Sequence, residues 1–163
     1  MTYSVANQKG GVGKTTTAVN LGAAYAQLGK RVLVVDLDQQ CNATVAFGLE
    51  KQDSPTTYEV LSGEVTLSEA AKPAGPENVW MVPASRDLAG AVVELPRLER
   101  PNHRLQEQVG SVDEDFDVVF IDCPPALGPI TVNSLVASDR VIVPVQAEYL
   151  ALEGLVEFLD TLS

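Results

Sequence analysis

A glycine-rich loop between a short apolar run and an Ala/Leu-rich segment constrains this chain more than any other feature. It contains Gln8 followed by Lys9, Gly10, Gly11, Val12, Gly13, Lys14, Thr15 and Thr16. Three glycines let a backbone turn tightly and bring its N–H groups close to an anion. The segment that follows has helical spacing, so the positive end of a helix dipole points at the same place. The stretch therefore predicts a phosphate-binding loop between a strand and a helix.

The side chains of this loop supply the remaining parts of a nucleoside-triphosphate site. Lys14 is expected to reach the terminal phosphates, and the Thr15 hydroxyl is expected to ligate Mg²⁺. The backbone from Gly10 to Thr16 would surround the phosphates. The alternative is a glycine-rich turn with two solvated lysines, which the ordered Gly-x-Gly-Lys-Thr-Thr and the segments on both sides disfavour.

The flanking segments predict one right-handed βαβ unit. The first strand is expected from Thr2 to Asn7, and the helix from Lys14 to Leu28, where Gly29 supplies a C-terminal stop. Residues 31–37 contain a continuous Val-Leu-Val-Val run, which is typical of a strand buried on both faces of a parallel sheet. A crossover of this kind between parallel strands is right-handed.

Three aspartates stand at predicted strand ends. Asp36 and Asp38 close the second strand, where open α/β sheets place their ligand sites. Asp122 follows the apolar run Val118–Ile121, which is the Walker B arrangement. A carboxylate there can hold Mg²⁺ through a water molecule. For Asp36 and Asp38, the alternative interpretation is a solvated strand end.

The rest of the chain predicts further alternation of helices and strands, and hence a three-layer α/β fold with a mainly parallel sheet and helices on both faces. The expected elements are short helices within 42–71, a loop over 73–76, a strand over 79–83, a helix capped by Ser85 that runs to about 95, a charged helix over 97–109, a strand over 116–121, a helix over 128–138, a strand over 140–144 and a helix over 148–162.

Composition narrows the class of protein. The 163 residues suit one compact domain. Eleven basic and 22 acidic residues give 11 − 22 = −11, so the chain lacks the overall basic charge of a nucleic-acid binder. Its two cysteines, Cys41 and Cys123, lack metal-ligand spacing and suit free thiols. No apolar signal core is present and no apolar run approaches the ~20 residues of a membrane span, so we expect a cytoplasmic protein.

Several motifs resemble the ParA/MinD group of ATPases. The loop departs from the standard phosphate-binding pattern because Gln8 replaces the first glycine and Lys9 lies inside it, and this resembles the deviant Walker A loop of that group. The segment from Val34 to Thr44 is similar to the second acidic motif of ParA proteins, with Gln39 in place of a proline and Cys41 in place of a glycine. Asp122-Cys-Pro-Pro and the segment over 144–154 are also similar, so the resemblance to ParA and Soj proteins covers the whole chain.

This resemblance implies the deviant Walker A type of P-loop fold and a slow, partner-stimulated ATPase that partitions DNA. It implies that Lys9 acts across an ATP-dependent homodimer, that Asp36 and Asp122 order the waters of Mg²⁺, and that Asp38 positions the attacking water. The implied partners are a second copy, a ParB-like activator and non-specific DNA of the nucleoid, with no membrane. Family members continue into further strands and helices, including the parts that recognise adenine and DNA, so we expect little direct DNA binding by these residues alone.

Two other functions remain open from the sequence. One is a nucleotide-gated binding module with little or no hydrolysis, which the changes at Gln39 and Cys41 favour. A positive φ at Cys41 would strain the turn by on the order of 1 kcal/mol. The other is a MinD-like regulator of division-site placement, which would need a C-terminal amphipathic membrane helix.

Overall fold

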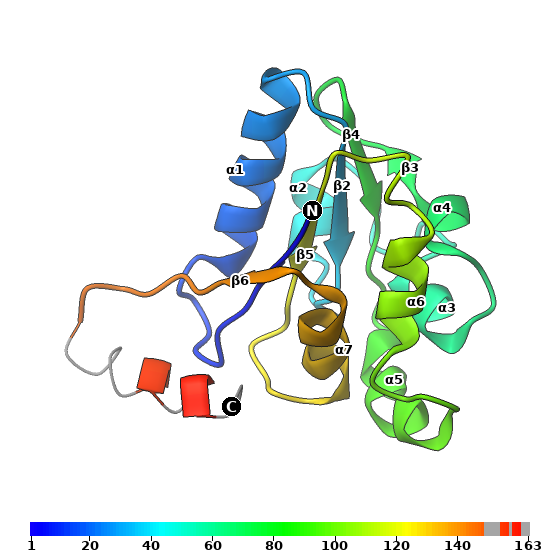
Figure 1. Cartoon of the computed structure of the whole chain (residues 1–163), viewed down its shortest axis with the longest axis vertical. Helices are drawn as coiled ribbons and strands as arrows, with labels where there is room; N and C mark the ends of the chain where they lie inside the picture. The colour runs from blue at the N-terminus through cyan, green and yellow to red at the C-terminus, as the bar shows by residue number, and fades with distance from the viewer. Residues whose placement is uncertain (149–153, 157, 161–163) are drawn as a thin grey trace.

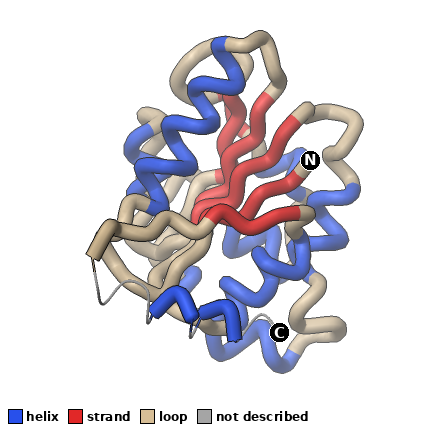
Figure 2. Tube along the Cα trace, turned by 60° about the vertical axis from the view of Figure 1, so that its left-hand side comes forward, coloured by secondary structure: helices blue, strands red, loops and turns tan. Residues whose placement is uncertain are grey.

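The computed structural model of the chain describes residues 1–148, 154–156 and 158–160. Within these residues one six-stranded sheet lies between two layers of helices (Figures 1 and 2). The predicted three-layer α/β architecture is confirmed. The structure has no helix, among the residues it describes, with the length and apolar character needed to cross a membrane.

The sheet is parallel except at one edge. Its strands are β1 (Thr2–Val5), β2 (Val32–Asp36), β3 (Lys72–Pro73), β4 (Val79–Val82), β5 (Val118–Asp122) and β6 (Arg140–Ile142). They lie in the order β3-β4-β2-β5-β1-β6, and only the β3–β4 pair is antiparallel. From β1 the chain continues to β2 on one side of the sheet, and from β5 it continues to β6 on the other side. The loop after β1 therefore lies where the strand order reverses, which is the point where open α/β sheets bind ligands.

The helices cover both faces of this sheet. They are α1 (Lys14–Gln27), α2 (Asn42–Ala46), α3 (Thr57–Ser62), α4 (Leu67–Ala70), α5 (Leu88–Glu94), the 3₁₀ turn η1 (Leu95–Arg97), α6 (Arg104–Gly110) and α7 (Pro129–Ala137).

Alternation along the buried strands creates two separate cores. Val32 and Val34 of β2 pack in the core beneath α1 and α2. Leu33 and Val35, one residue out of phase, pack in the larger core beneath α3 to α7. Because successive side chains of a strand point to opposite faces, a run without polar residues is needed to satisfy both cores at once. The apolar run in β2 is therefore explained by burial on both faces of the sheet, as the sequence predicted.

Three sequence-based expectations differ from the structure, and a fourth lies partly outside the described residues. The predicted loop over 73–76 overlaps β3, an edge strand too short to give a periodic signal. Ser85 does not cap α5; that helix begins at Leu88, and the Ser85 hydroxyl instead accepts a hydrogen bond from Asp87 N at 3.3 Å. The predicted helix over 97–109 is divided into η1 and α6. The predicted helix over 148–162 lies partly outside the described residues, with 154–156 and 158–160 helical.

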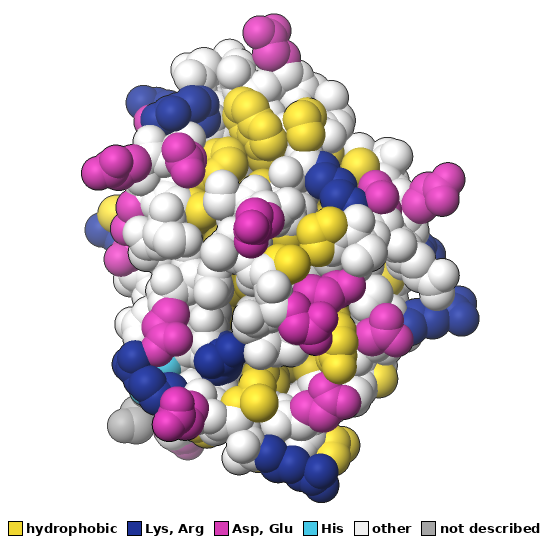
Figure 3. Space-filling view, turned by 90° about the vertical axis from the view of Figure 1, so that its right-hand side faces the viewer, with side chains coloured by type: hydrophobic (Ala, Val, Ile, Leu, Met, Phe, Trp, Pro, Cys, Tyr) yellow, Lys and Arg dark blue, Asp and Glu magenta, His cyan; other side chains and the backbone are white. Residues whose placement is uncertain are grey.

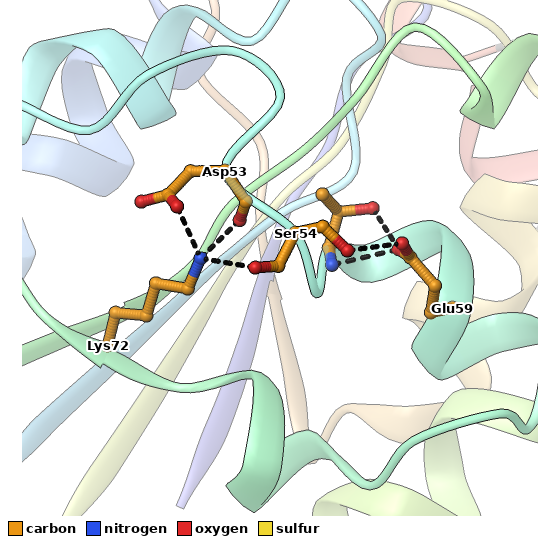
Figure 4. A network of polar contacts seen from close by, with 5 residues as sticks. Asp53, Ser54, Glu59 and Lys72 are labelled. Atoms are coloured by element: carbon orange, nitrogen blue, oxygen red, sulfur yellow. Dashed lines mark hydrogen bonds and ion pairs between the residues drawn. The ribbon is translucent and has the colours of Figure 1, made fainter.

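A polar network fixes the chain between α2 and α3 (Figure 4). Lys72 of β3 pairs with the Asp53 carboxylate at 3.0 Å and donates to the Ser54 carbonyl at 3.1 Å. Glu59 accepts from the Ser54 hydroxyl and from Thr56 N, both at 2.8 Å, and closes a capping box at the start of α3. These contacts hold the segment between α2 and α3 against the β3 edge of the sheet, away from the loop after β1.

Charge on the helical face that carries α3, α4 and α6 is mixed. Figure 3 shows acidic side chains spread across this face, with basic and apolar side chains between them. No extended basic patch is visible on this face of the described residues.

The turn between β2 and α2 contains the strained residue that the sequence predicts. Cys41 adopts φ 59° and ψ 35°, in the left-handed region, and its side chain is fully buried. Its N–H donates to Asp38 O at 2.8 Å, which closes the turn. The left-handed conformation costs a residue with a Cβ atom about 1–2 kcal/mol, and glycine avoids this cost.

We therefore predict that Cys41→Gly will be at least as stable as Cys41→Ala in urea denaturation. Both variants lose the sulfur, but only glycine removes the backbone strain. At this position glycine should therefore match or exceed alanine, although alanine is the more stable of the two in most helices. As a control, Ala43→Gly within α2 should follow the usual order and lose about 1 kcal/mol. A Cys41→Gly variant clearly less stable than Cys41→Ala would show that the strain is not significant.

Candidate functional site

The parallel register brings the candidate residues to one edge of the sheet. Asp122 at the end of β5 lies opposite Val5 of β1 on one side and opposite Asp36 of β2 on the other. Because the carboxyl ends of parallel strands share an edge, the glycine-rich loop after β1 lies next to both aspartates. Residues that are far apart in sequence thus converge on one site.

The loop has the backbone geometry of an anion cradle. Gly11 and Gly13 adopt φ 73° and 93°, positive values that residues with a Cβ atom rarely adopt. Among the described residues, no acceptor bonds to any backbone N–H from Gly10 to Thr16. Unpaired N–H groups at the start of a fourteen-residue helix form a site of positive potential. This part of the structure can bind phosphate oxygens without rearrangement of hydrogen bonds.

Lys14 lies beneath this cradle. Its side chain is 7% exposed, and Nζ donates to the Lys9 carbonyl at 3.1 Å. Burial lowers the pKa of Lys14, while the nearby carboxylates of Asp122 and Asp38 oppose that shift. The bond to the loop carbonyl holds the ammonium group next to the place where a terminal phosphate would lie.

Asp122 is a fully buried carboxylate without a hydrogen-bond partner. Both of its oxygens lack a donor among the described residues. Burial raises the pKa of Asp122 to about 7. The Thr15 hydroxyl opposes this rise most, although it lies outside normal hydrogen-bond geometry, and the Lys14 ammonium opposes it less. A buried group in this state costs stability unless a ligand satisfies it.

These residues fit a hydrated Mg²⁺ ion. The orphaned oxygens of Asp122 face the Thr15 side of the loop, and hard oxygen donors are the ligands that Mg²⁺ prefers. The described residues contain no cluster of three or more His, Cys, Asp or Glu that could enclose a metal. Mg²⁺ keeps several waters and uses few protein ligands, so one hydroxyl and one carboxylate are a sufficient protein contribution.

Asp36 is engaged in a different way. One of its oxygens accepts from Asp38 N at 3.0 Å, and the other accepts from Thr44 N at 2.9 Å and Thr44 Oγ1 at 2.7 Å. Burial raises the pKa of Asp36 to about 6, and the hydrogen bonds from Thr44 oppose this. Its carboxylate therefore organises the turn that carries Asp38. The sequence pattern contained Thr44, but gave no sign of this contact.

Asp38 faces the cavity beside the loop. The cavity has a volume of about 370 Å³. It is lined by Asp38, Gln40, Asn42 and Pro125 together with the loop residues Gly10, Gly11, Gly13, Lys14, Thr15 and Thr16. The Asp38 carboxylate accepts from Gln40 N at 3.0 Å, which fixes its rotamer. It is thus a carboxylate held at the wall of a phosphate-sized space.

The segment after β6 crosses the loop, which the sequence did not indicate. Asn7 Nδ2 donates to the Pro144 carbonyl at 2.9 Å, and Gln146 Nε2 donates to Gly11 O at 3.3 Å. Lys9 Nζ pairs with Glu148 at 3.3 Å, with both side chains largely exposed. The structure therefore places Lys9 at the rim of the site, whereas Lys14, Thr15 and Asp38 line the cavity and Asp122 is buried beside Thr15.

Comparison with known proteins identifies the family. A family model described as an AAA domain matches residues 1–163. The chain belongs to this family. The resemblance to ParA and Soj proteins is confirmed by curated relatives. Soj, the sporulation initiation inhibitor of Bacillus subtilis, is 49% identical over 160 residues, which cover 97% of this chain and 63% of the relative. The chromosome partitioning protein ParA of Caulobacter vibrioides is 43% identical over 162 residues, which cover 98% and 61%.

Solved structures share the fold. Cobyrinic acid a,c-diamide synthase from Mycobacterium smegmatis, with a bound ATP analogue and magnesium, matches with a TM-score of 0.92 and 45% identity over 98% of this chain and 66% of that one. An ATP complex of McdA from Cyanothece matches with a TM-score of 0.91 and 30% identity over 98% and 61%. The chain spans about 60% of the length of the curated relatives it matches.

The unpartnered carboxylate of Asp122 predicts a pH-dependent stability. The folded-state pKa of about 7 exceeds the ordinary value of 3.8, so the folded chain holds a proton that the unfolded chain has released. This contribution is fully present below about pH 4 and is lost as the pH rises to about 7. We expect Asp122→Asn to raise the free energy of unfolding of the nucleotide-free chain at pH 8 by about 2 kcal/mol, and to weaken its fall between pH 5 and 8.

Urea denaturation at the two pH values measures this. Asp113→Asn, which changes an exposed carboxylate, is the matched control and should leave the profile unchanged. Equal pH profiles for wild type and Asp122→Asn would contradict the assignment of a buried, unpartnered charge.

Proposed function

We propose that this chain is the nucleotide-binding part of a ParA/Soj-type partitioning ATPase, which binds ATP with Mg²⁺ and hydrolyses it to ADP and phosphate. The observation that carries the proposal is the orphaned Asp122 carboxylate next to Lys14, below a row of unpaired loop N–H groups. The names of the relatives and the ATP and magnesium in the solved neighbours support it.

The residues divide the work of phosphoryl transfer among them. The N–H groups from Gly10 to Thr16 and the Lys14 ammonium would hold the phosphates and stabilise charge that develops on them. Thr15 and Asp122 would hold Mg²⁺, which neutralises negative charge on the phosphate oxygens. Asp36 would act mainly by fixing the turn that carries Asp38, because its oxygens already accept hydrogen bonds from that turn.

Asp38 would position the attacking water. Its carboxylate lies at the cavity wall, and its rotamer is set by Gln40 N. A carboxylate there can accept a proton or a hydrogen bond from water without touching the loop N–H groups. Orientation of the nucleophile by a fixed acceptor is the chief protein contribution in many nucleotide hydrolases.

Lys9 would act in a second subunit. In this chain its ammonium group is turned to Glu148 at the rim, and it is about half exposed. An exposed ion pair contributes little, about 0–1 kcal/mol, so release of Lys9 toward a partner's phosphates is inexpensive. Hydrolysis would then depend on ATP-driven dimerisation, and a ParB-like protein would stimulate it in the cell.

DNA binding is proposed for the whole partitioning protein rather than for these residues. The chain carries a net charge of −11, and the face in Figure 3 lacks an extended basic patch. Counterion release from DNA needs clustered cations. A second candidate function is a nucleotide-gated binding module with little turnover, which the strained turn at Cys41 favours because it adjoins Asp38.

We predict that Asp38→Ala will bind ATP within about three-fold of wild type but lose turnover by roughly 10²–10⁴, the usual contribution of a positioned acid or base. Calorimetric ATP titration and phosphate release measure the two effects. Glu77→Ala, in the turn before β4 at the opposite edge of the sheet, is the control and should keep both properties. Wild-type turnover in Asp38→Ala would remove this residue from the mechanism.

We also predict that ATP, but not ADP, will shift the chain from monomer to dimer in light scattering, and that Lys9→Ala will abolish the shift. The physical reason is the loss of the cation that reaches the partner's phosphates. Lys30→Ala removes an exposed lysine after α1 and should dimerise normally. Dimers of Lys9→Ala that form as readily as those of wild type would contradict the proposed role in trans.

A further inference from the structure

Two cations face one cavity beside the turn after β2. Lys51 and Arg86 come from distant parts of the chain, and they line a cavity of about 400 Å³ together with Gln39, Gln40 and Ala89. We call this the basic cavity. Both cations also oppose the rise in the pKa of the Cys41 thiol that burial causes, so both lie close to the same turn.

Neither cation of this pair is engaged by another side chain within the described residues. Neither side chain has an ion pair or a hydrogen bond there. The nearby Asp53 is paired with Lys72 at 3.0 Å. Asp87, the neighbour of Arg86, interacts with Ser85 instead. Although the chain has twice as many acidic as basic residues, the lining of this cavity contains two cations and no carboxylate.

An apolar groove adjoins the basic cavity. It has a volume of about 230 Å³ and lies between the turn after β2 and the loop after β5. Its apolar lining is Leu37, Leu88, Val92, Pro124, Pro125, Ala126 and Ile130. Val92 on α5 is 45% exposed, and its neighbour Val93 is 59% exposed. Gln39 and Gln40 line both the groove and the basic cavity, so the two spaces lie side by side.

We propose that the apolar groove and the basic cavity together bind a short segment of a partner protein in which a bulky apolar side chain lies close to a carboxylate. The apolar side chain would fill the groove, and the carboxylate would lie between Lys51 and Arg86. Neither space alone specifies this partner. A free anion gains nothing from the groove, and an uncharged apolar segment leaves the two cations unpaired.

The apolar groove also adjoins the cavity beside the glycine-rich loop. Asp38, Gln40 and Pro125 line both the groove and the cavity beside the glycine-rich loop. A segment bound in the groove would therefore contact the same turn that carries Asp38. This link to the nucleotide rests on the proposed function, whereas the docking itself does not.

A defined set of fluorescent peptides tests the docking. Each contains one Asp or Glu and one Leu, Ile, Val, Phe or Met, in either order and at several spacings, in a Gly/Ser background. Binding to the nucleotide-free chain is measured by fluorescence polarisation. We expect at least one peptide to bind, and the matching acid-only and apolar-only peptides to bind roughly ten-fold more weakly.

Matched variants locate the site. Lys51→Glu with Arg86→Glu should weaken binding by roughly ten-fold or more, and Val92→Ser should also weaken it. Lys30→Glu with Arg97→Glu makes the same change in net charge at cations outside the cavity, and Val45→Ser changes a valine of similar exposure, 50%, on α2. These controls should bind as wild type. Circular dichroism and thermal unfolding verify that every variant is folded.

Three results would overturn the proposal. They are no binding by any peptide of the set, equal binding by the acid-only peptides, and equal loss of binding in the control variants. A second peptide titration, in the presence of ATP, tests the link to the turn that carries Asp38. If the link exists, ATP should change the peptide affinity by several-fold. Failure of the chain to bind ATP would remove the proposed function and this link, while the nucleotide-free titration would still decide the docking.

Discussion

The site depends on the register between β5 and its two neighbours. Pairing of Asp122 with Val5 and with Asp36 sets the ends of three strands at the same level, and this alone places a carboxylate beneath the glycine-rich loop. A slip of one residue would turn Asp122 to the other face of the sheet. The two cores prevent such a slip, because every residue of β2 and β5 is buried and their apolar side chains alternate between the two cores.

Within that frame, the site stores unfavourable interactions that a ligand can relieve. Asp122 is buried without donors, Lys14 is buried with one carbonyl acceptor, and the N–H groups of the loop lack acceptors. Each buried polar group without a partner costs folding free energy. In the proposed function, a magnesium–nucleotide complex would supply all of these partners together, which would explain why the fold tolerates their absence. Cys41 adds backbone strain next to the same site.

Much of this could be predicted from the sequence, and the failures have definite causes. The loop, α1, β2 and the strand before Asp122 carry strong local signals, and the structure places them within a few residues of the predicted bounds. The failures lie where tertiary contacts outweigh local preference. β3 forms only because β4 offers it an edge, and Ser85 bonds within its own turn instead of capping α5. The contacts of Asp36 with Thr44 and of Lys9 with Glu148 join residues whose spacing carries no periodic signal.

The sequence by itself determined the class of fold, the phosphate-binding loop and the candidate carboxylates, because glycine freedom, helical spacing and apolar runs act over short distances along the chain. Only the tertiary structure decided how those carboxylates differ. Asp122 is left without partners, Asp36 is committed to its own turn, and Asp38 faces a cavity. The basic cavity of Lys51 and Arg86 was likewise invisible in the sequence, because one cation follows α2, the other precedes α5, and only the folded chain brings them to one cavity. Burial and partnership depend on neighbours in space, and no local pattern encodes them.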